Sequence, residues 1–295
     1  MIYIGGYAAE NNRGIYLLND DLSLHHQICD DEGTSYFDVD EQNIYTILKR
    51  NDKGGVAVFD HDGKEKACRL FDKKPGCFIK KYNGRIYCAY YHDACVQIFD
   101  EQLTLLHELI YPQGSKCHCV DFFKDKFAVV CLGLDLICFY DYDFHFLEAF
   151  EFPKGSGPRH MVHTQDEKQL MVITELSNQL FILDSKGNVE EVFSIKEKED
   201  VVTTGAAIRL SADEKHLYTS TRGQDILKHF VYDERWQEVQ CIHLKGSLPR
   251  DFQLFEDALV VGYQGSCLVE KMQLDHDYVG DVIQSANYDK IVCIK

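Results

Sequence analysis

The sequence predicts an all-β protein, a seven-bladed β-propeller with four antiparallel strands in each blade. A short β-type run, a polar turn and a second β-type run recur about every 42 residues, and such a period of short strands is typical of propellers. The chain has 295 residues, so the period fits about seven times. The first runs carry matching residues: Tyr3, Tyr45, Tyr87, Ala128, Met171, Tyr218 and Val260. Because each sheet of such a ring packs against two neighbours, we expect a single domain over residues 1–295.

The best-defined repeat predicts four strands, at residues 159–163, 169–174, 179–183 and 189–195. Polar residues and glycine separate these runs, at 166–167, 177–178 and 185–188, and they favour tight turns for steric and hydrogen-bonding reasons. Five further quartets begin near Tyr36, Phe78, His118, Ala207 and Arg250. Six blades are therefore expected within the chain.

The seventh blade is expected to join the two ends of the chain. The N-terminal runs 2–5 and 14–18 would pair with a C-terminal run at 290–295. Such closure removes an exposed edge strand and holds both termini in one sheet.

Composition limits the class of partner. Forty-eight acidic and thirty-one basic residues give a formal net charge of −17, which opposes binding to nucleic acids and to anionic membrane surfaces. The apolar stretches fall short of the roughly 20 residues that a membrane span requires. We expect neither a nucleic-acid partner nor a membrane, and the oligomeric state stays open.

The cysteines and the N-terminal residues suggest a cellular compartment. The chain begins Met1, Ile2, Tyr3, which is typical of a strand and lacks the basic and apolar regions of a secretory signal. Twelve cysteines are scattered through expected strands, as is usual for reduced thiols in a cytosol. The expected location is the cytoplasm.

The propeller geometry gathers polar residues from distant blades. The start of each inner strand and the turn between the second and third strands lie on the same face of the ring. Inner-strand starts contribute His118, Arg159, His160, Arg250 and Asp251. The second-to-third turns contribute Lys49, Arg50, Glu175, Arg222, Asp225 and Gln264. Arginines around one mouth of an otherwise acidic protein predict a small anionic ligand.

Several motifs in these positions resemble a known family. They are 118–120 with 132–135, 157–160 with 174–176, 206–213 with 221–223, and 249–252 with Gln264. In this order they are similar to the seven-bladed propeller lactonases, which include the propeller type of 6-phosphogluconolactonase and a fungal carboxymuconate cyclizing enzyme. The resemblance covers the whole chain and is most specific from His118 onward.

The resemblance implies a functional cluster of His118, Arg159, Glu175 and Arg222, with Arg250 as a fifth member. The chain departs from the family pattern at Tyr90 and Cys131, and at Thr174, Thr221 and Tyr263, where the family usually has other residues. It also has lysines at positions 49 and 116, whose charge is compatible with a phosphorylated sugar lactone.

The resemblance implies a lactone hydrolase, most closely one acting on 6-phospho-D-glucono-1,5-lactone in the pentose phosphate pathway. Glu175 would be the general base, and arginines would bind an anion or oxyanion. His118 would pass a proton to the leaving alkoxide. The expected catalytic residues are Glu175, His118 and Arg222. The expected substrate-binding residues are Arg159, His160, Arg250, Asp251, Gln264 and Lys49.

Other interpretations remain open. The Glu175 and Arg222 pair is compatible with a purely structural salt bridge. The same arginines would serve a cyclizing lyase or isomerase as carboxylate clamps, and a propeller that only binds a ligand or partner is a third reading.

No metal and no cofactor are expected from the sequence. Strand alternation directs Cys117 and Cys119 to one face and His118 to the other, which argues against a chelate from this triplet. The turn positions do not supply the set of carboxylates that calcium prefers.

Overall fold

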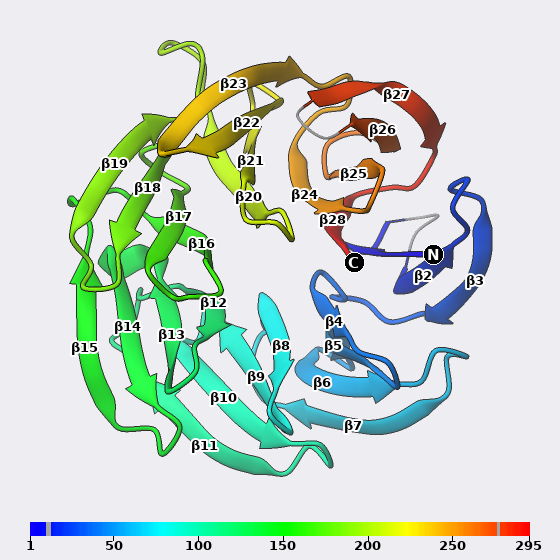
Figure 1. Cartoon of the computed structure of the whole chain (residues 1–295). Coiled ribbons are helices and arrows are strands. Elements are labelled where there is room, and N and C mark those ends of the chain that lie inside the picture. The colour runs from blue at the N-terminus through cyan, green and yellow to red at the C-terminus, as the bar shows by residue number, and fades with distance from the viewer. Residues whose placement is uncertain (10–12, 276–277) are drawn as a thin grey trace.

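The computed structural model describes residues 1–9, 13–275 and 278–295, and in these ranges 28 strands form seven four-stranded antiparallel sheets. Figure 1 shows the sheets arranged as the blades of a ring around a central axis. The predicted seven-bladed propeller is confirmed. One short helix is described, the 3₁₀ turn Leu132–Leu134, and among the described residues no helix has the length and apolar character needed to cross a membrane.

Each blade has its innermost strand at the channel and its outermost strand at the rim. Blade 1 contains β4 (Phe37–Val39), β5 (Ile44–Arg50), β6 (Lys53–Phe59) and β7 (Glu65–Phe71). Blade 2 contains β8 (Phe78–Tyr82), β9 (Arg85–Tyr90), β10 (Cys95–Asp100) and β11 (Leu105–Ile110). Blade 3 contains β12 (Cys117–Phe122), β13 (Lys126–Cys131), β14 (Leu136–Asp141) and β15 (Phe146–Glu151).

The second half of the ring repeats this plan. Blade 4 contains β16 (Pro158–His163), β17 (Gln169–Thr174), β18 (Gln179–Asp184) and β19 (Val189–Ser194). Blade 5 contains β20 (Thr204–Leu210), β21 (His216–Arg222), β22 (Ile226–Asp233) and β23 (Arg235–His243). Blade 6 contains β24 (Pro249–Leu254), β25 (Ala258–Tyr263), β26 (Val269–Asp275) and β27 (Tyr278–Ala286).

Blade 7 closes the ring with both ends of the chain, as predicted. Its strand order is β28 (Ile291–Ile294), β1 (Ile2–Gly6), β2 (Ile15–Leu18) and β3 (Leu24–Cys29). Ile4 pairs with Ile294, and Tyr3 and Lys295 exchange two backbone hydrogen bonds, of 2.8 and 3.0 Å. The C-terminal strand is thus the innermost strand, next to the channel (Figure 1).

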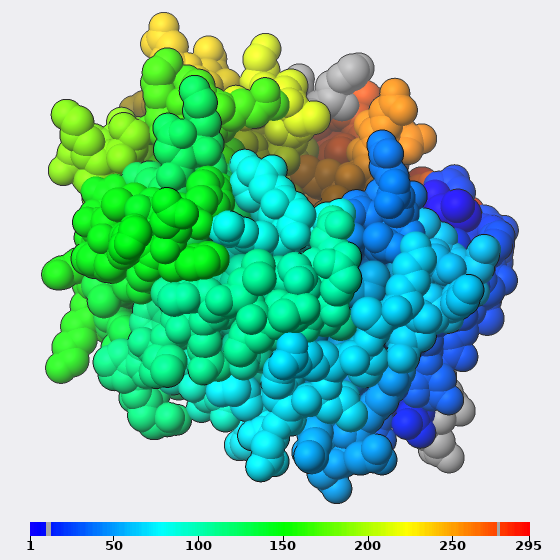
Figure 2. Space-filling view, turned by 90° about the horizontal axis from the view of Figure 1, so that it is seen from below, coloured from blue at the N-terminus to red at the C-terminus, as the bar shows by residue number. Residues whose placement is uncertain are grey.

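The core lies between neighbouring blades, where the faces of adjacent sheets pack together. Trp236 is buried in the cluster between blades 4 and 5, and its indole Nε1 donates a hydrogen bond to Gln169. Figure 2, a view onto the rim, shows blades from the first half of the chain packed side by side. All twelve cysteines lie in described ranges as free thiols, nearly all buried or half-buried.

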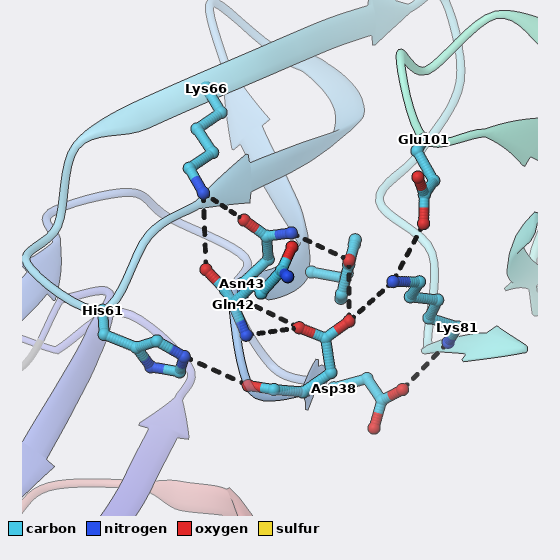
Figure 3. A network of polar contacts seen from close by, with 9 residues as sticks. Asp38, Gln42, Asn43, His61, Lys66, Lys81 and Glu101 are labelled. Atoms are coloured by element: carbon cyan, nitrogen blue, oxygen red, sulfur yellow. Dashed lines mark hydrogen bonds and ion pairs between the residues drawn. The ribbon is translucent and has the colours of Figure 1, made fainter. Parts of the chain in front are cut away.

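Polar contacts also join the blades, on the face of the ring opposite the candidate site described below. Lys81 of blade 2 bonds Asp40 at 2.7 Å and Glu101 at 2.9 Å, and its backbone N–H donates to Asp38. His61 bonds the Asp40 carbonyl at 3.1 Å and the Tyr3 hydroxyl at 2.6 Å. Figure 3 shows the network around Lys81 and His61. These contacts tie blades 7, 1 and 2 into a rigid frame.

Candidate functional site

The site is centred on the carboxylate of Glu175, which follows β17 at one mouth of the channel. Arg159 Nε and Arg222 Nη2 both approach the same oxygen, Glu175 Oε2, at 2.9 and 3.0 Å. Arg159 starts the inner strand of blade 4 and Arg222 ends the second strand of blade 5. The structure therefore brings these three residues together as the sequence predicts.

Backbone carbonyls of β20, in blade 5, hold both guanidinium groups. Arg159 Nη1 donates to the carbonyl of Ala206, and Arg222 Nη2 donates to that of Gly205 at 3.1 Å. Arg159 is 2% exposed. Because a planar, permanently charged group is fixed on two sides, its orientation is set before any ligand binds.

Local bulges in the inner strands place the polar residues at the channel. In each inner strand the cross-strand pairing skips one residue, so this residue has no partner on the neighbouring strand. The skipped residues are His118, Arg159 and Arg250. A bulge breaks the alternation of side chains and re-aims the extra residue. All three residues line a cavity at the mouth. The strict alternation expected from the sequence around His118 therefore does not hold at this point.

Arg250 completes a group of three arginines. Its guanidinium lies 5.4 Å from the centre of the Tyr7 ring, and its Nη1 donates to Gln264 Oε1 at 3.0 Å. Gln264 follows β25, in the turn position expected for it. Arg250 is thus oriented by an aromatic face and an amide, and it forms no ion pair with a carboxylate among the described residues.

His118 is buried and neutral. Burial, followed by the charges of Arg159 and Arg250, lowers its pKa well below the usual value. Its ring meets the edge of Tyr91 and lies 5.1 Å from the ring of His160. Its Nδ1 atom is buried without a hydrogen-bond partner among the described residues. A buried polar atom in such a state indicates a place for a ligand or water.

These side chains surround a cavity of about 460 Å³. Its lining residues are Tyr7, Gly33, Ser35, Lys74, Pro75, Gly76, Cys77, Tyr91, His92, His118, Glu175, Arg222 and Arg250. A narrow extension with Arg159, His160 and Tyr36 in its wall leads toward the channel interior. The volume suits a small molecule of sugar size.

The charges of the site act on one another. Burial would raise the pKa of Glu175, but Arg159, Arg222 and Arg250 outweigh it and lower the pKa. Burial, with Arg222 and Arg250, lowers the pKa of Arg159 to about 10, so it is charged at neutral pH. The cavity therefore holds an ionised carboxylate with an excess of positive charge, an arrangement suited to an anionic ligand.

Some predicted residues lie elsewhere. Asp251 is buried with its carboxylate bonded to Arg209 at 2.6 Å and to the backbone N–H of Ile294 at 3.0 Å, which joins blades 5, 6 and 7. Lys49 pairs with Asp52 at 2.9 Å and is not part of the cavity lining. Both were expected to bind substrate. Asp251 follows the bulged Arg250 and turns the opposite way, while the turn of blade 1 directs Lys49 to solvent.

His160 lies deeper in the channel than expected. It is 6% exposed and borders both the narrow extension and a second cavity at the opposite mouth. Its ring is surrounded by Tyr36, Phe78 and His118. It separates the two mouths of the channel.

Several lining residues were missed by the sequence analysis. Tyr7 follows β1, and Tyr91 and His92 follow β9, which are the second strands of their blades. Applying the turn rule to every blade would have found them. Cys77 also lines the cavity, but burial raises the pKa of its thiol to about 12, which makes it a poor nucleophile at neutral pH.

The donor set of the cavity does not fit a metal cofactor. Among the described residues in its lining, Glu175 is the one carboxylate, and two guanidinium groups already converge on it. A divalent cation needs several oxygen or nitrogen ligands and would meet three arginines there. The cavity is built for negative charge.

The fold and the site define a propeller with an arginine-rich cavity at one mouth of its channel. The chain belongs to the family described as lactonase, 7-bladed β-propeller, whose model matches residues 1–295. A relative, the uncharacterized protein YwcC of Lactococcus lactis, is 28% identical over 305 residues, which cover 90% of this chain and 89% of the relative.

Two solved structures share the fold. The periplasmic gluconolactonase of Pseudomonas aeruginosa superposes with a TM-score of 0.89 at 18% sequence identity. The superposition covers 100% of this chain and 98% of the gluconolactonase chain. A Bacteroides fragilis protein, described provisionally as a 6-phosphogluconolactonase, gives a TM-score of 0.83 at 21% identity, with 100% and 96% covered.

Proposed function

We propose that this protein hydrolyses a six-carbon sugar lactone, with 6-phospho-D-glucono-1,5-lactone as its preferred substrate. The observation that carries the proposal is the Glu175 carboxylate, held through one oxygen by Arg159 and Arg222 at the wall of a sugar-sized cavity. Family membership supports the reaction class. The names of the two structural neighbours refer to gluconate lactones, and we carry that substrate class to this chain.

Glu175 acts as the general base in this mechanism. Both guanidinium groups bond Oε2, which leaves Oε1 to orient a water molecule. The water oxygen attacks the lactone carbonyl carbon while its proton passes to Glu175. The ring C–O bond then breaks, and the departing alkoxide takes a proton back from Glu175 or from solvent, giving the hydroxy acid. General-base catalysis of this kind typically contributes about 10²- to 10⁴-fold.

Arg222 and Arg250 bind negative charge in this scheme. Arg222 Nε is buried without a partner among the described residues, so it has a donor for the developing oxyanion. Arg250 and Lys74 border the cavity and are suited to the phosphate group. A bound anion also offsets the arginine charges that weaken Glu175 as a base, so substrate binding raises the basicity of the carboxylate.

His118 serves as a neutral hydrogen-bonding group. Because its pKa is well below the usual value, it carries no proton to donate as an imidazolium at neutral pH. Its unpartnered Nδ1 is available to a substrate hydroxyl or a water, which it orients. Proton transfer to the alkoxide is therefore assigned to Glu175.

A second candidate follows from the three arginines. Three guanidinium groups around one cavity also fit an unsaturated dicarboxylate, which a cyclizing lyase or isomerase would close through an intramolecular bond. In that case Glu175 would move a proton on carbon. Binding of an anion without any reaction is the remaining alternative.

The compartment follows from the thiols. We place the protein in the cytoplasm, because twelve free cysteines persist more readily in a reducing environment.

The test is the rate of acid release from 6-phospho-D-glucono-1,5-lactone and from the unphosphorylated lactone, each compared with buffer because lactones hydrolyse spontaneously. We expect acceleration of both, and at least about a tenfold preference for the phosphorylated form, since one charged contact contributes about 1.5–3 kcal/mol. Rates equal to those of buffer on both lactones would contradict the proposal. Turnover of an unsaturated dicarboxylate in the same preparation would favour the cyclizing alternative.

A further inference from the structure

Three potential metal ligands meet at the rim of blade 5, away from the cavity. They are Glu197, in the segment between β19 and β20, and Cys241 and His243 near the end of β23. Their ligand atoms all lie within 4.8 Å of one another. Glu197 and His243 are exposed and Cys241 is half-buried, so an ion can reach the cluster from solvent.

Strand geometry explains why the two residues of β23 point the same way. Residues two apart in a strand share a face, and Ile242 between them packs toward the core shared with blade 6. Cys241 and His243 therefore face the opposite side, where Glu197 lies. A Cys-x-His pair on one strand presents a sulfur and an imidazole nitrogen side by side.

Glu197 is held in position by the neighbouring turn. The side-chain oxygen of Gln224 accepts hydrogen bonds from the backbone N–H groups of Glu197 and Lys198, at 2.7 and 3.0 Å. Gln224 also donates to the carbonyl of Lys198. Asp225 in the same turn accepts a backbone bond from Leu244, directly after His243, at 2.9 Å. One turn thus fixes both the segment with Glu197 and the end of β23.

One ligand–ligand distance and the types of ligand fit zinc. Glu197 Oε2 and His243 Nε2 are 3.3 Å apart, which is the spacing of two ligands bonded at about 2.0 Å to one tetrahedral ion. A set of one thiolate, one imidazole and one carboxylate suits Zn²⁺ better than Ca²⁺ or Mg²⁺, which prefer oxygen. Three protein ligands leave a fourth position open to water.

We propose that Glu197, Cys241 and His243 form a Zn²⁺ site that fastens the segment between β19 and β20 to the outer strand of blade 5. The ion replaces the proton of the Cys241 thiol and bonds the thiolate, the imidazole nitrogen and a carboxylate oxygen. This segment continues into β20, whose Gly205 and Ala206 carbonyls hold Arg222 and Arg159. The site is independent of the proposed lactone chemistry.

The proposal is tested on the purified full chain after treatment with a chelator. Zn²⁺ titration should show one equivalent bound, and Co²⁺ as a spectroscopic probe should give the charge-transfer band of a thiolate ligand. Cys241→Ser should remove the band, and His243→Gln should weaken Zn²⁺ binding at least tenfold. Cys267→Ser and His145→Gln, which change an exposed cysteine and an exposed histidine of other blades, should change neither.

Alkylation of the unaltered chain keeps the test independent of folding in the variants. Zn²⁺ should protect Cys241, located by peptide mass, from a thiol reagent, while the exposed Cys267 stays reactive. The proposal is overturned by a chain that shows no thiolate band with Co²⁺, by a band that persists in Cys241→Ser, or by alkylation of Cys241 at the same rate with and without Zn²⁺.

Discussion

Replacing Glu175 with glutamine separates a catalytic carboxylate from a purely structural one. The change keeps the size of the side chain and one oxygen for Arg159 but removes the charge shared with Arg222. At about 4 Å between charge centres, each ion pair is worth roughly 4 kcal/mol of attraction near a protein surface. Much of that attraction is offset by desolvation, and removing one partner of a buried pair typically costs about 3–5 kcal/mol.

Because Glu175→Gln retains one hydrogen bond, we expect it to lower the free energy of unfolding by about 3 kcal/mol, the lower end of this range. This corresponds to a fall in Tm of roughly 6–12 °C. Lactone hydrolysis above the buffer rate should fall by about 10²- to 10⁴-fold, because the general base is lost. Both are measured on one preparation, by thermal unfolding and by acid release well below the lowered Tm.

A matched control is Glu270→Gln. Glu270 is buried, whereas Glu175 is half-buried, and it accepts a hydrogen bond from the Tyr263 hydroxyl at 2.6 Å, outside the cavity. The Glu270→Gln variant should be less stable than the wild type and should hydrolyse the lactone at the wild-type rate. If Glu175→Gln loses stability but retains more than a tenth of the wild-type rate, the carboxylate is a structural salt bridge and the mechanism is refuted.

Four further outcomes are expected. Arg222→Lys removes the guanidinium group, whose Nη2 contacts both Glu175 and the Gly205 carbonyl and whose Nε is the proposed oxyanion donor. The kcat/KM in steady-state assays should therefore fall at least about tenfold, and an unchanged value would exclude Arg222 from the site. The pKa of Glu175 is lowered in the folded, unliganded protein, so its contribution to stability is present above the unfolded pKa and is lost as pH falls through the folded pKa. Because kcat/KM reports the unliganded protein, the acid limb of the kcat/KM profile should lie below pH 4.5. The low pKa of His118 should leave the rate flat between about pH 6 and 7, and a step near 6.5 would contradict its neutral state. Tyr263→Phe removes the hydrogen bond to Glu270 and leaves a buried carboxylate oxygen unpaired, so the free energy of unfolding in denaturant should fall by about 1–3 kcal/mol. The rate of lactone hydrolysis should not change, and a loss of this rate would place Tyr263 in the mechanism.

Much of the site followed from repeat position. Arg159, Glu175 and Arg222 lie where the starts of inner strands and the second-to-third turns were expected to converge, and ion pairs join them. Gln264 occupies its expected turn and bonds Arg250, but it does not line the cavity. Position in the repeat carries this information because every blade has the same orientation to the channel.

The same rule failed for Asp251 and Lys49. Asp251 lies away from the cavity because its carboxylate bonds Arg209 and the backbone N–H of Ile294, and these contacts between blades cannot be predicted from the pattern of one strand. Lys49 occupies the right kind of turn, but its side chain pairs with Asp52. Tyr7 and Tyr91 line the cavity with aromatic rings, and a pattern of charged and hydrogen-bonding residues does not single them out.

The sequence by itself determined the number of blades, the closure by both termini and the family, because a regular period of short strands leaves one efficient way to bury their faces. Only the tertiary structure decided which side chains enter the channel and that Glu197 meets Cys241 and His243 across the rim. The physical reason is that bulges, local turns and packing between blades depend on contacts among residues far apart in the chain, and these contacts leave no periodic trace in the order of amino acids.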